Sequence, residues 1–358
     1  MLEEIEEKIG LFIGDEGKYN EFVKKYHYVQ FLNCQYSIDE MEKVVIESGA
    51  QVLFAFAEDN WYINRLLWSC DNVETVCVVN GNNPYITEQN KNRMANARMW
   101  DYIAVNSNSN IEAGGWYNSY SGLPFSEQEM KEFADDVYIK LKEYIDESKT
   151  ILEIGCASGI TMYRLAPYCR QYIGTDMAAV NLKKNQEYIE KNNIHNICLF
   201  QCEANQVGKV CQQPVNIVII NSVVQYFPGI NYLKQVVEAA CQLISQIPEG
   251  GIVYIGDVMD LDKKNGLYES LIEYKKAHPE AKTKQNLSEE LFLPRHFFYY
   301  LQGLIPEVSE VIISDKEGRT NNELLSYRYD VILKINTFNK GVNKKILKKQ
   351  MAYNFFDD

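Results

Sequence analysis

The sequence lacks any long apolar segment. None of its 358 residues fall in a run approaching the roughly 20 apolar residues that a membrane-spanning helix needs. Met1 to Lys8 is acidic rather than basic, and no apolar core follows it, so the start does not have the pattern of a signal peptide. Hydrophobic residues make up 46% and charged residues 24%, which is ordinary for a globular protein. We therefore expect a cytoplasmic protein that binds no membrane.

An excess of basic residues and a regular cysteine pattern are missing as well. The chain has 36 basic and 49 acidic residues, a net charge of -13, which argues against a nucleic-acid partner, although Lys340 to Lys349 is locally basic. Its nine cysteines form no Cys-x-x-Cys pair. Cys198, Cys202 and the nearby His195 lack the regular spacing of zinc ligands. We expect reduced thiols and no metal.

Two phosphate-binding patterns, Gly-Lys-Ser/Thr and Gly-x-Gly-x-x-Gly, are absent from the most informative stretch, Thr150 to Gly159. This stretch reads Thr-Ile-Leu-Glu-Ile-Gly-Cys-Ala-Ser-Gly, and Ile160 to Leu165 follows it with a helical pattern. The order strand, tight turn, helix predicts the first unit of a doubly wound α/β sheet. Gly155 and Gly159 allow the backbone to approach a ligand closely.

Two acidic residues indicate which ligand this loop holds. Glu153, at the strand end, is a poor neighbour for a pyrophosphate and a good one for a cation. Asp176, at the tip of the next apolar strand, has the position that reaches the ribose hydroxyls of a nucleoside in this fold. A nucleoside with a positive charge and no phosphate is S-adenosylmethionine. A structural turn without a ligand is the less favoured alternative. Further cofactor contacts are expected from Cys156, Ala157, Met177, Glu203, Ala204, Asn221 and Ser222.

The chain is predicted to form two domains and a tail. Residues 1–96 read as a small structural or docking α/β domain, which ends in a polar linker at Asn82 to Asn96. Met1 to about Asn33 is expected to be helical, and no glycine-rich loop marks a second cofactor site. Residues 97–338 form the catalytic domain, and 339–358 a basic C-terminal tail. The other predicted elements of the small domain are a helix capped by Ser37, a strand at 51–57, a helix at 61–69 and a strand at 75–79.

An aromatic, glycine-rich segment, 114–122, precedes the cofactor strand. We interpret it as a lid over cofactor and substrate, with an Ω-loop packed for stability as the alternative. Trp116, Tyr117 and Asn118 are assigned to the substrate, and Tyr120 and Gly122 to the cofactor. The following helix, 125–145, has a capping box at its start.

Later strands deliver polar residues to the same edge of the sheet. The buried strand 216–220 ends at Asn221, Ser222, Gln225 and Tyr226, where open α/β sheets bind ligands. Gly256 and Asp257 follow the predicted strand 252–255 at its carboxyl end. The remaining predicted elements are helices at 180–192, 232–245, 261–277 and 291–301, and strands at 197–202, 308–314 and 327–335.

Several motifs together resemble the methyltransferase domains embedded in nonribosomal peptide synthetases and polyketide synthases. The resemblance covers about Trp100 to Ile335. It departs at Ala157, where the family has its middle glycine, and no adenylation, condensation or carrier motif surrounds the domain. The chain is therefore a stand-alone member or an excised piece. The motifs are Trp-x-x-Ser-Tyr-x-Gly at 116–122, Ile-Leu-Glu-Ile-Gly-Cys-Ala-Ser-Gly at 151–159, Tyr-Ile-Gly-Thr-Asp at 172–176, Asn-Ser-Val-Val-Gln-Tyr-Phe-Pro at 221–228, Gly-Asp-Val at 256–258, and Asn-Glu-Leu and Tyr-Arg-Tyr-Asp at 322–330.

The resemblance implies a class I, Rossmann-like seven-stranded sheet and the product S-adenosylhomocysteine. It also implies methylation of an amine, a hydroxyl or an active carbon on an intermediate held by an acyl or peptidyl carrier protein, with neighbouring synthase modules as partners. No histidine directly follows the fourth strand, which favours nitrogen or oxygen over carbon. A methyltransferase of free small molecules and a scaffold without catalysis are the rival hypotheses.

Catalysis by in-line displacement depends on positioning and exclusion of water. An amine needs only to lose its proton, whereas a hydroxyl or carbon needs a base. Asp257 and Tyr226 are the favoured orienting residues, His296 is a less favoured base, and Glu323 is a further candidate. Each has a structural alternative, such as packing, helix capping or a surface position. Gln225, Asn322 and Arg328 complete the predicted substrate site.

Overall fold

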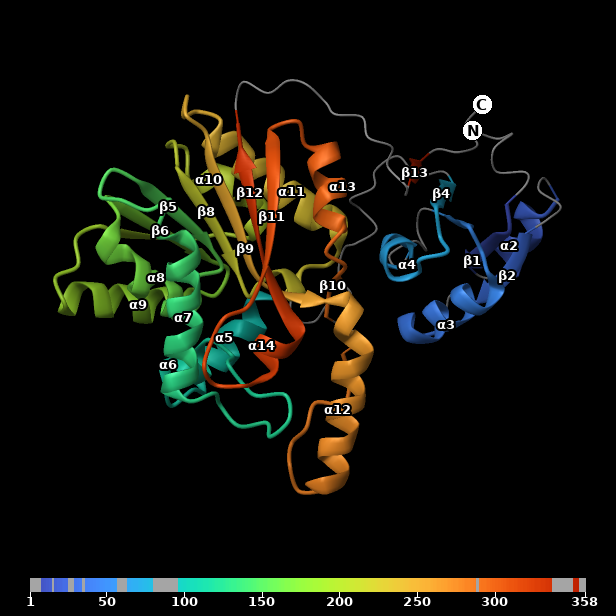
Figure 1. The fold of residues 1–358 in the computed structure, drawn as a ribbon, viewed down its shortest axis with the longest axis horizontal. Helices are drawn as coiled ribbons and strands as arrows, with labels where there is room; N and C mark the ends of the chain where they lie inside the picture. Colours follow the sequence, from blue (N-terminus) through green and yellow to red (C-terminus); the bar gives the residue numbers. More distant parts are fainter. Residues whose placement is uncertain are drawn as a thin grey trace. The chain divides into compact units, whose positions relative to one another are not determined.

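The computed structural model describes residues 8–14, 16–24, 29–33, 36–56, 63–79, 96–287, 290–336 and 350–353. The chain divides into two compact units, which are described separately (Figure 1). The smaller unit holds the described residues before 80 and the strand at 350–353. The larger holds most of 96–336. The predicted linker at 82–95 and the basic segment 340–349 lie outside the described residues.

The smaller unit is a five-stranded parallel sheet with the order β13-β4-β3-β1-β2. The helical prediction for the first 33 residues is wrong, because two strands and one short helix occupy this stretch. The strand β1 has a continuous apolar sequence and is buried along its whole length, as expected for an inner strand of a parallel sheet. Its elements are β1 (Gly10–Gly14), α2 (Glu16–Phe22), β2 (Val29–Asn33), α3 (Ile38–Ser48), β3 (Val52–Phe56), α4 (Ile63–Ser69), β4 (Thr75–Val79) and β13 (Gln350–Tyr353).

The strand β13 was not anticipated. It comes from the segment predicted to be a basic tail, and it pairs in parallel with β4 from Gln350↔Thr75 to Tyr353↔Val78. The two ends of the sequence therefore contribute to one sheet, a pairing that no local pattern in the sequence indicates.

The larger unit contains the predicted seven-stranded sheet, with the order β11-β12-β9-β8-β5-β6-β7 and with β10 added beside β9. The strands β5 to β9 pair in parallel, as does β10 with β9, whereas β12 runs antiparallel to both β9 and β11. This order confirms the expected class I sheet. The strands are β5 (Thr150–Ile154), β6 (Gln171–Asp176), β7 (Ile197–Gln201), β8 (Ile217–Asn221), β9 (Gly251–Asp260), β10 (Phe292–Leu293), β11 (Val308–Asp315) and β12 (Arg328–Ile335).

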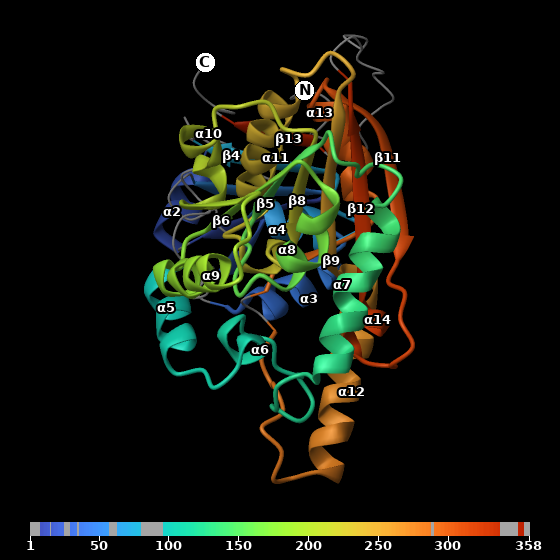
Figure 2. The same cartoon turned by 90° about the vertical axis from the view of Figure 1, so that its left-hand side faces the viewer.

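Helices connect and cover these strands. Figure 2 shows α7, α8 and α9 in front of β5, β6 and β8. Their apolar side chains, among them Leu141, Leu165 and Ile189, pack with Tyr172 and other sheet residues in one core cluster. The longer helices are α5 (Ala97–Val105), α7 (Glu127–Leu141), α8 (Ile160–Leu165), α9 (Ala179–Lys191), α11 (Ile230–Ile244), α12 (Lys264–Ala277), α13 (Phe297–Leu304) and α14 (Glu323–Tyr327).

The prediction of one helix over 291–301 is only partly right. Phe292 and Leu293 pair with the end of β9, and the helix α13 begins at Phe297. Pro294 separates the two elements, since a proline disfavours helical geometry in the residue before it. The predicted capping box of α7 is present, because Ser126 and Glu129 bond reciprocally.

Candidate functional site

Three residues of the loop between β5 and α8 have left-handed backbone angles. The φ values are 81° at Gly155, 42° at Ala157 and 84° at Gly159. A Cβ on Gly155 would lie 2.5 Å from a methyl carbon of Val223, so this glycine also provides a close approach of two loops. Ala157 therefore stands where the backbone itself favours glycine, and its small side chain limits the strain. The loop is positioned by Thr175, whose carbonyl accepts from Gly155 N at 2.7 Å and Cys156 N at 2.9 Å.

Asp176 connects this loop to the end of β6. Its Oδ2 accepts from Ala157 N at 2.8 Å, and its Oδ1 accepts from Ala178 N at 2.8 Å. Burial raises the pKa of Asp176, and these backbone hydrogen bonds oppose the shift. The carboxyl group thus fixes the glycine loop at the end of β6.

Glu153 lies in the sheet interior. It is 2% exposed, and its Oε2 accepts from Tyr172 Oη at 2.9 Å. Burial raises the pKa of Glu153 to about 8. A carboxyl with that pKa is mostly neutral at pH 7, so in this structure Glu153 links β5 to β6. This placement gives no support to its predicted role as a partner of a cation.

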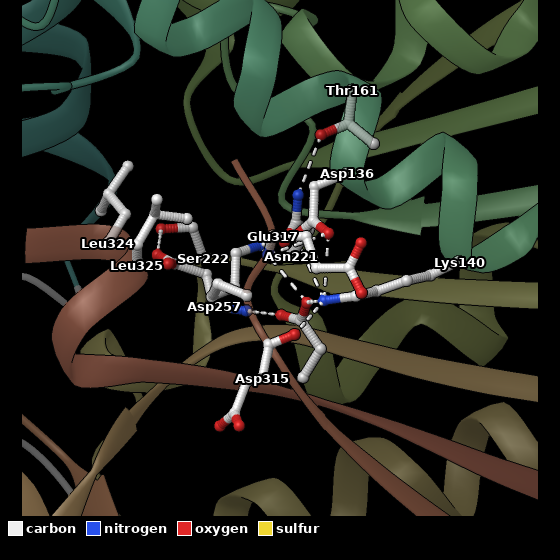
Figure 3. Close-up of polar contacts among 12 residues, drawn as sticks. Asp136, Lys140, Thr161, Asn221, Ser222, Asp257, Asp315, Glu317, Leu324 and Leu325 are labelled. Atoms are coloured by element: carbon white, nitrogen blue, oxygen red, sulfur yellow. Dashed lines mark hydrogen bonds and ion pairs between the residues drawn. The ribbon is translucent and has the colours of Figure 1, made fainter. Parts of the chain in front are cut away.

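A second group of polar side chains lies at the end of β8 and beside it within β9, because β9 continues to Asp260 and does not end before Asp257 as predicted (Figure 3). Ser222 and Asp257 both have left-handed backbones, with φ of 57° and 59°. Ser222 Oγ donates to Asp257 Oδ2 at 2.7 Å, and Gln225 Nε2 donates to Ser222 Oγ at 2.9 Å. Asn221 Nδ2 donates to Thr161 Oγ1 of α8 at 3.1 Å. Sequence-distant loops are thereby joined at one edge of the sheet.

Arg328, at the start of β12, carries the buried positive charge of this region and is 7% exposed. Burial acts to lower the pKa of Arg328, but the neighbouring Asp257, Glu290 and Glu323 raise it. We name these four residues the Arg328 cluster. Burial raises the pKa of Asp257, with Arg328 as the main opposing influence. The cluster therefore places three carboxyl groups around one guanidinium group.

Several atoms of the Arg328 cluster have no hydrogen-bond partner within the described part of the chain. They are Arg328 Nε and Nη1, Asp257 Oδ1 and Glu290 Oε2. The other oxygen of Glu290 is paired with Lys284 Nζ at 2.5 Å. Buried polar groups are nearly always satisfied by protein, water or ligand, so these atoms are free to bond to a polar group that enters the cluster.

Comparison with known proteins matches residues 145–294 to a family described as "Methyltransferase domain". This chain contains a methyltransferase domain. The domain is related to parts of nonribosomal peptide synthetases. Chondramide synthase of Chondromyces crocatus is 27% identical over 240 residues, which are 63% of this chain and 6% of that protein. Cyclosporin synthetase of Tolypocladium inflatum is 25% identical over 356 residues, 93% of this chain and 2% of that protein.

The chain thus spans only a small fraction of these synthetases. Among solved structures, the N-methyltransferase NodS of Bradyrhizobium japonicum in complex with S-adenosyl-L-homocysteine is 12% identical. That match covers 67% of this chain and 97% of NodS, with a TM-score of 0.41. Among the described residues, no helix has the length and apolar character needed to cross a membrane, and no cluster of three metal-ligating side chains occurs.

The aromatic loop of the methyltransferase domain is attached to two other segments. Glu323 accepts from Ser119 N and Ser119 Oγ, each at 2.8 Å. Thr283 Oγ1 donates to Tyr120 O at 2.7 Å, and Tyr120 Oη lies 2.8 Å from Ser270 Oγ of α12. A Cβ on Gly122, where φ is 71°, would lie 2.5 Å from Lys282 Cβ. These contacts place the loop beside Glu323, a member of the Arg328 cluster.

The remaining residues predicted to bind substrate make contacts with their own surroundings. Trp116 packs edge-on against Phe133 at 4.7 Å, and Tyr117 is 43% exposed. Asn118 accepts from the Tyr120 and Ser121 amides and so shapes the loop. Asn322 caps α14 by accepting from the Leu324 and Leu325 amides. These contacts do not join the four residues in one site. Their assignment to a substrate stays a prediction.

Of the predicted catalytic side chains, Tyr226 and Asp257 lie together in the methyltransferase domain. The ring centroids of Tyr226 and Trp100 are 5.0 Å apart. Burial raises the pKa of Tyr226, and the nearby Glu290 acts in the same direction. His296 is exposed at the start of α13. Glu203 is exposed, Met177 is partly buried, and Ala204 and Cys156 are buried; their cofactor contacts stay predictions.

Sequence reasoning did not find Glu290. Glu290 follows a stretch without helical or strand periodicity. It comes near Arg328 because the adjacent strand β10 pairs with β9. No local pattern signals this arrangement. The predicted strand 327–335 includes Arg328, but the sequence does not show which neighbours bury its charge.

Proposed function

We propose that this chain transfers a methyl group from S-adenosylmethionine to a nitrogen or oxygen atom of a peptide or polyketide intermediate bound to a carrier protein. The methyltransferase domain and its relationship to nonribosomal peptide synthetases support the reaction class and the biosynthetic setting. The acceptor atom and the carrier are the parts that the proposal adds.

The residues around the glycine loop fit this cofactor. Gly155 and Gly159 carry no side chain and Ala157 only a methyl group, so the backbone of the loop can approach a ligand closely, and Asp176 lies beside it. When bound, S-adenosylmethionine supplies an electrophilic methyl group on a sulfonium. The chain's own residues hold the loop in place, because Thr175 and Asp176 bond three of its successive amides.

The observation that carries the proposal is the set of unpaired buried atoms in the Arg328 cluster. The guanidinium offers N–H donors that suit a carbonyl oxygen of an aminoacyl or peptidyl group. Asp257 and Glu290 offer acceptor oxygens that suit an N–H or O–H group. A protonated acceptor must give up a proton in the reaction, and in this proposal Asp257 is the base that receives it; burial raises the pKa of Asp257, which supports that role.

Calorimetric titration with S-adenosylmethionine and S-adenosylhomocysteine tests the cofactor half. We expect binding by the wild type and a large loss in Asp176→Ala. The acceptor half is tested by incubating the enzyme with carrier-tethered aminoacyl and hydroxyacyl groups and with the same free acids, followed by mass spectrometry. A methyl gained only on carrier-bound groups supports the proposal. Methylation of free acids alone would replace it with a small-molecule enzyme, and absence of cofactor binding would leave a scaffold.

A further inference from the structure

Four charged side chains are buried together behind Asp257. Asp136 and Lys140 come from α7, Lys316 follows β11, and Asp330 lies in β12. The side chains of Asp136, Asp330 and Lys316 are 1% exposed, and that of Lys140 is 9% exposed. Lys316 Nζ lies 2.9 Å from Asp136 Oδ2, and Lys140 Nζ lies 3.1 Å from Asp136 Oδ1. We name these four residues the buried ion network; part of it appears in Figure 3.

Asp330 uses its two oxygens in two directions. Its Oδ2 is paired with Lys140 and lies 3.4 Å from Lys316 Nζ. Its Oδ1 accepts from the backbone N–H of Asp257 at 2.7 Å. The network therefore reaches the backbone of a residue whose side chain belongs to the Arg328 cluster.

The contact falls at an irregularity in the sheet. The register of β12 against β9 passes from Tyr329↔Val258 to Val331↔Ile255, so Asp330 stands opposite two residues of β9, Gly256 and Asp257. Such a bulge reorients a side chain and is frequent beside active sites. The φ of 59° at Asp257 is unfavourable for a residue other than glycine. This conformation takes the backbone N–H of Asp257 out of the hydrogen bonding between β9 and β12. The Asp330 carboxylate accepts from this N–H instead.

Lys140 and Lys316 keep the buried carboxyl group of Asp330 ionised. Burial acts to raise the pKa of Asp330, but Lys316 and Lys140 hold it below its usual range. An ionised Asp330 accepts at both oxygens, whereas an amide has only one acceptor oxygen to divide between the lysines and Asp257 N. The ion network thus maintains the acceptor that the bulge requires.

We propose that Asp330 is a positioning residue for methyl transfer, which holds the bulge at Asp257 and thereby directs the Asp257 carboxyl toward Ser222 and Arg328. Lys316, whose Nζ lies 3.4 Å from Asp330 Oδ2, keeps this carboxylate in place when Lys140 and Asp136 are replaced. This inference rests on the proposed function, in which the Asp257 side chain faces the acceptor.

The test compares two double variants that each lose one aspartate and the same lysine. Asp330→Asn with Lys140→Met leaves a single acceptor oxygen at position 330, for which Lys316 and Asp257 N compete, and keeps the Asp136–Lys316 pair. Asp136→Asn with Lys140→Met keeps the Asp330–Lys316 pair and the hydrogen bond to Asp257. Both retain one buried ion pair, so a general cost in folding should be similar. Thermal unfolding, calorimetric titration with S-adenosylmethionine, and kcat and KM with the carrier-bound acceptor are measured for both.

We expect the Asp330→Asn double variant to lose about tenfold or more in kcat, because a small displacement of a reacting group is costly. Its dissociation constant for S-adenosylmethionine should stay near that of the wild type, and the Asp136→Asn double variant should keep most of its kcat. Equal losses of kcat in the two would overturn the inference and leave a stabilising network only. A wild type without methyl transfer would instead reject the proposed function.

A single variant, Asp330→Glu, covers the case in which the first double variant does not fold. It keeps the charge but moves the carboxylate by one methylene, so the hydrogen bond to Asp257 N should be displaced. Reduced kcat with unchanged cofactor affinity is expected. A kcat equal to that of the wild type would contradict a positioning role.

Discussion

The two halves of the candidate site are constructed in different ways. The cofactor half consists of the glycine loop and Asp176, which lie within about one β-α-β unit and are joined by backbone hydrogen bonds. The Arg328 cluster takes its members from four separate segments between Asp257 and Arg328, and charged side chains hold it together. The first half is therefore specified locally, whereas the second depends on the whole sheet being assembled. Substitutions in the two halves should have correspondingly different consequences.

The largest effect is expected at Arg328. Its replacement by Met leaves Asp257, Glu290 and Glu323 buried without their shared cation. We expect a lower free energy of unfolding, because three buried carboxyl groups lose the positive charge that offsets them, together with loss of methyl transfer. Urea denaturation measures the first and the carrier-bound assay the second. Arg328→Lys is the control that keeps the charge, and an unfolding free energy of Arg328→Met equal to the wild type would contradict the cluster's electrostatic role.

In the cofactor half, Asp176→Ala should chiefly affect binding. It removes the hydrogen bonds to Ala157 N and Ala178 N, as well as the proposed contact with the ribose. We expect the dissociation constant for S-adenosylmethionine to rise about a hundredfold, which corresponds to roughly 2.7 kcal/mol. Calorimetry measures this change. Asp262→Ala, at an exposed position after β9, is a matched control, and equal affinities for S-adenosylmethionine in the wild type and Asp176→Ala would remove Asp176 from the site.

The sequence predicted the locally specified half well and the other half poorly. The bounds of β5 and α8 follow directly from the apolar run and the glycines, and Asp176 was placed correctly at the end of β6. Glu153 bonds to Tyr172 inside the sheet, a contact that the sequence does not reveal, and its role beside a cation stays a prediction. The side-chain direction of one strand residue depends on which face is buried, and a strand covered on both faces has no alternation to show it.

Long-range contacts account for the other differences. The hydrogen bond from Asp257 N to Asp330 joins residues 73 positions apart, and β13 joins a sheet from the far end of the chain. Neither leaves a periodic signal in its own segment. The helix predicted over 291–301 failed for a similar reason, since Phe292 and Leu293 pair with β9 instead of continuing into α13.

Glu153→Gln separates the structural role of this residue from the predicted role as a partner of a cation. The pKa of Glu153 is raised to about 8 in the folded chain, from an ordinary value of 4.5. The folded state then binds more protons than the unfolded state, so this group's contribution to stability falls as pH rises between those two values. The slope is about 1.4 kcal/mol per pH unit, and glutamine should remove it while still accepting from Tyr172.

Urea denaturation of the wild type and Glu153→Gln between pH 5.5 and 7.5 measures this difference, and we expect the variant to gain relative stability as pH rises. Its affinity for S-adenosylmethionine at pH 7 should be close to that of the wild type. Tyr172→Phe is the control that removes the other partner of the hydrogen bond. A large loss of affinity in Glu153→Gln would restore the electrostatic role.

The smallest effect is expected from Ala157→Gly, which restores a glycine at the middle of the cofactor loop. The φ of 42° at Ala157 is unfavourable for alanine by about 1 kcal/mol, and the greater freedom of glycine in the unfolded chain offsets part of that gain. We expect a net gain of about 0.5 kcal/mol in unfolding free energy by urea denaturation. The same substitution at Ala178, whose φ is -83°, relieves no strain and should destabilise. If both variants are destabilised alike, the left-handed turn at Ala157 costs nothing, and the hydrogen bond from its amide to Asp176 already compensates for it.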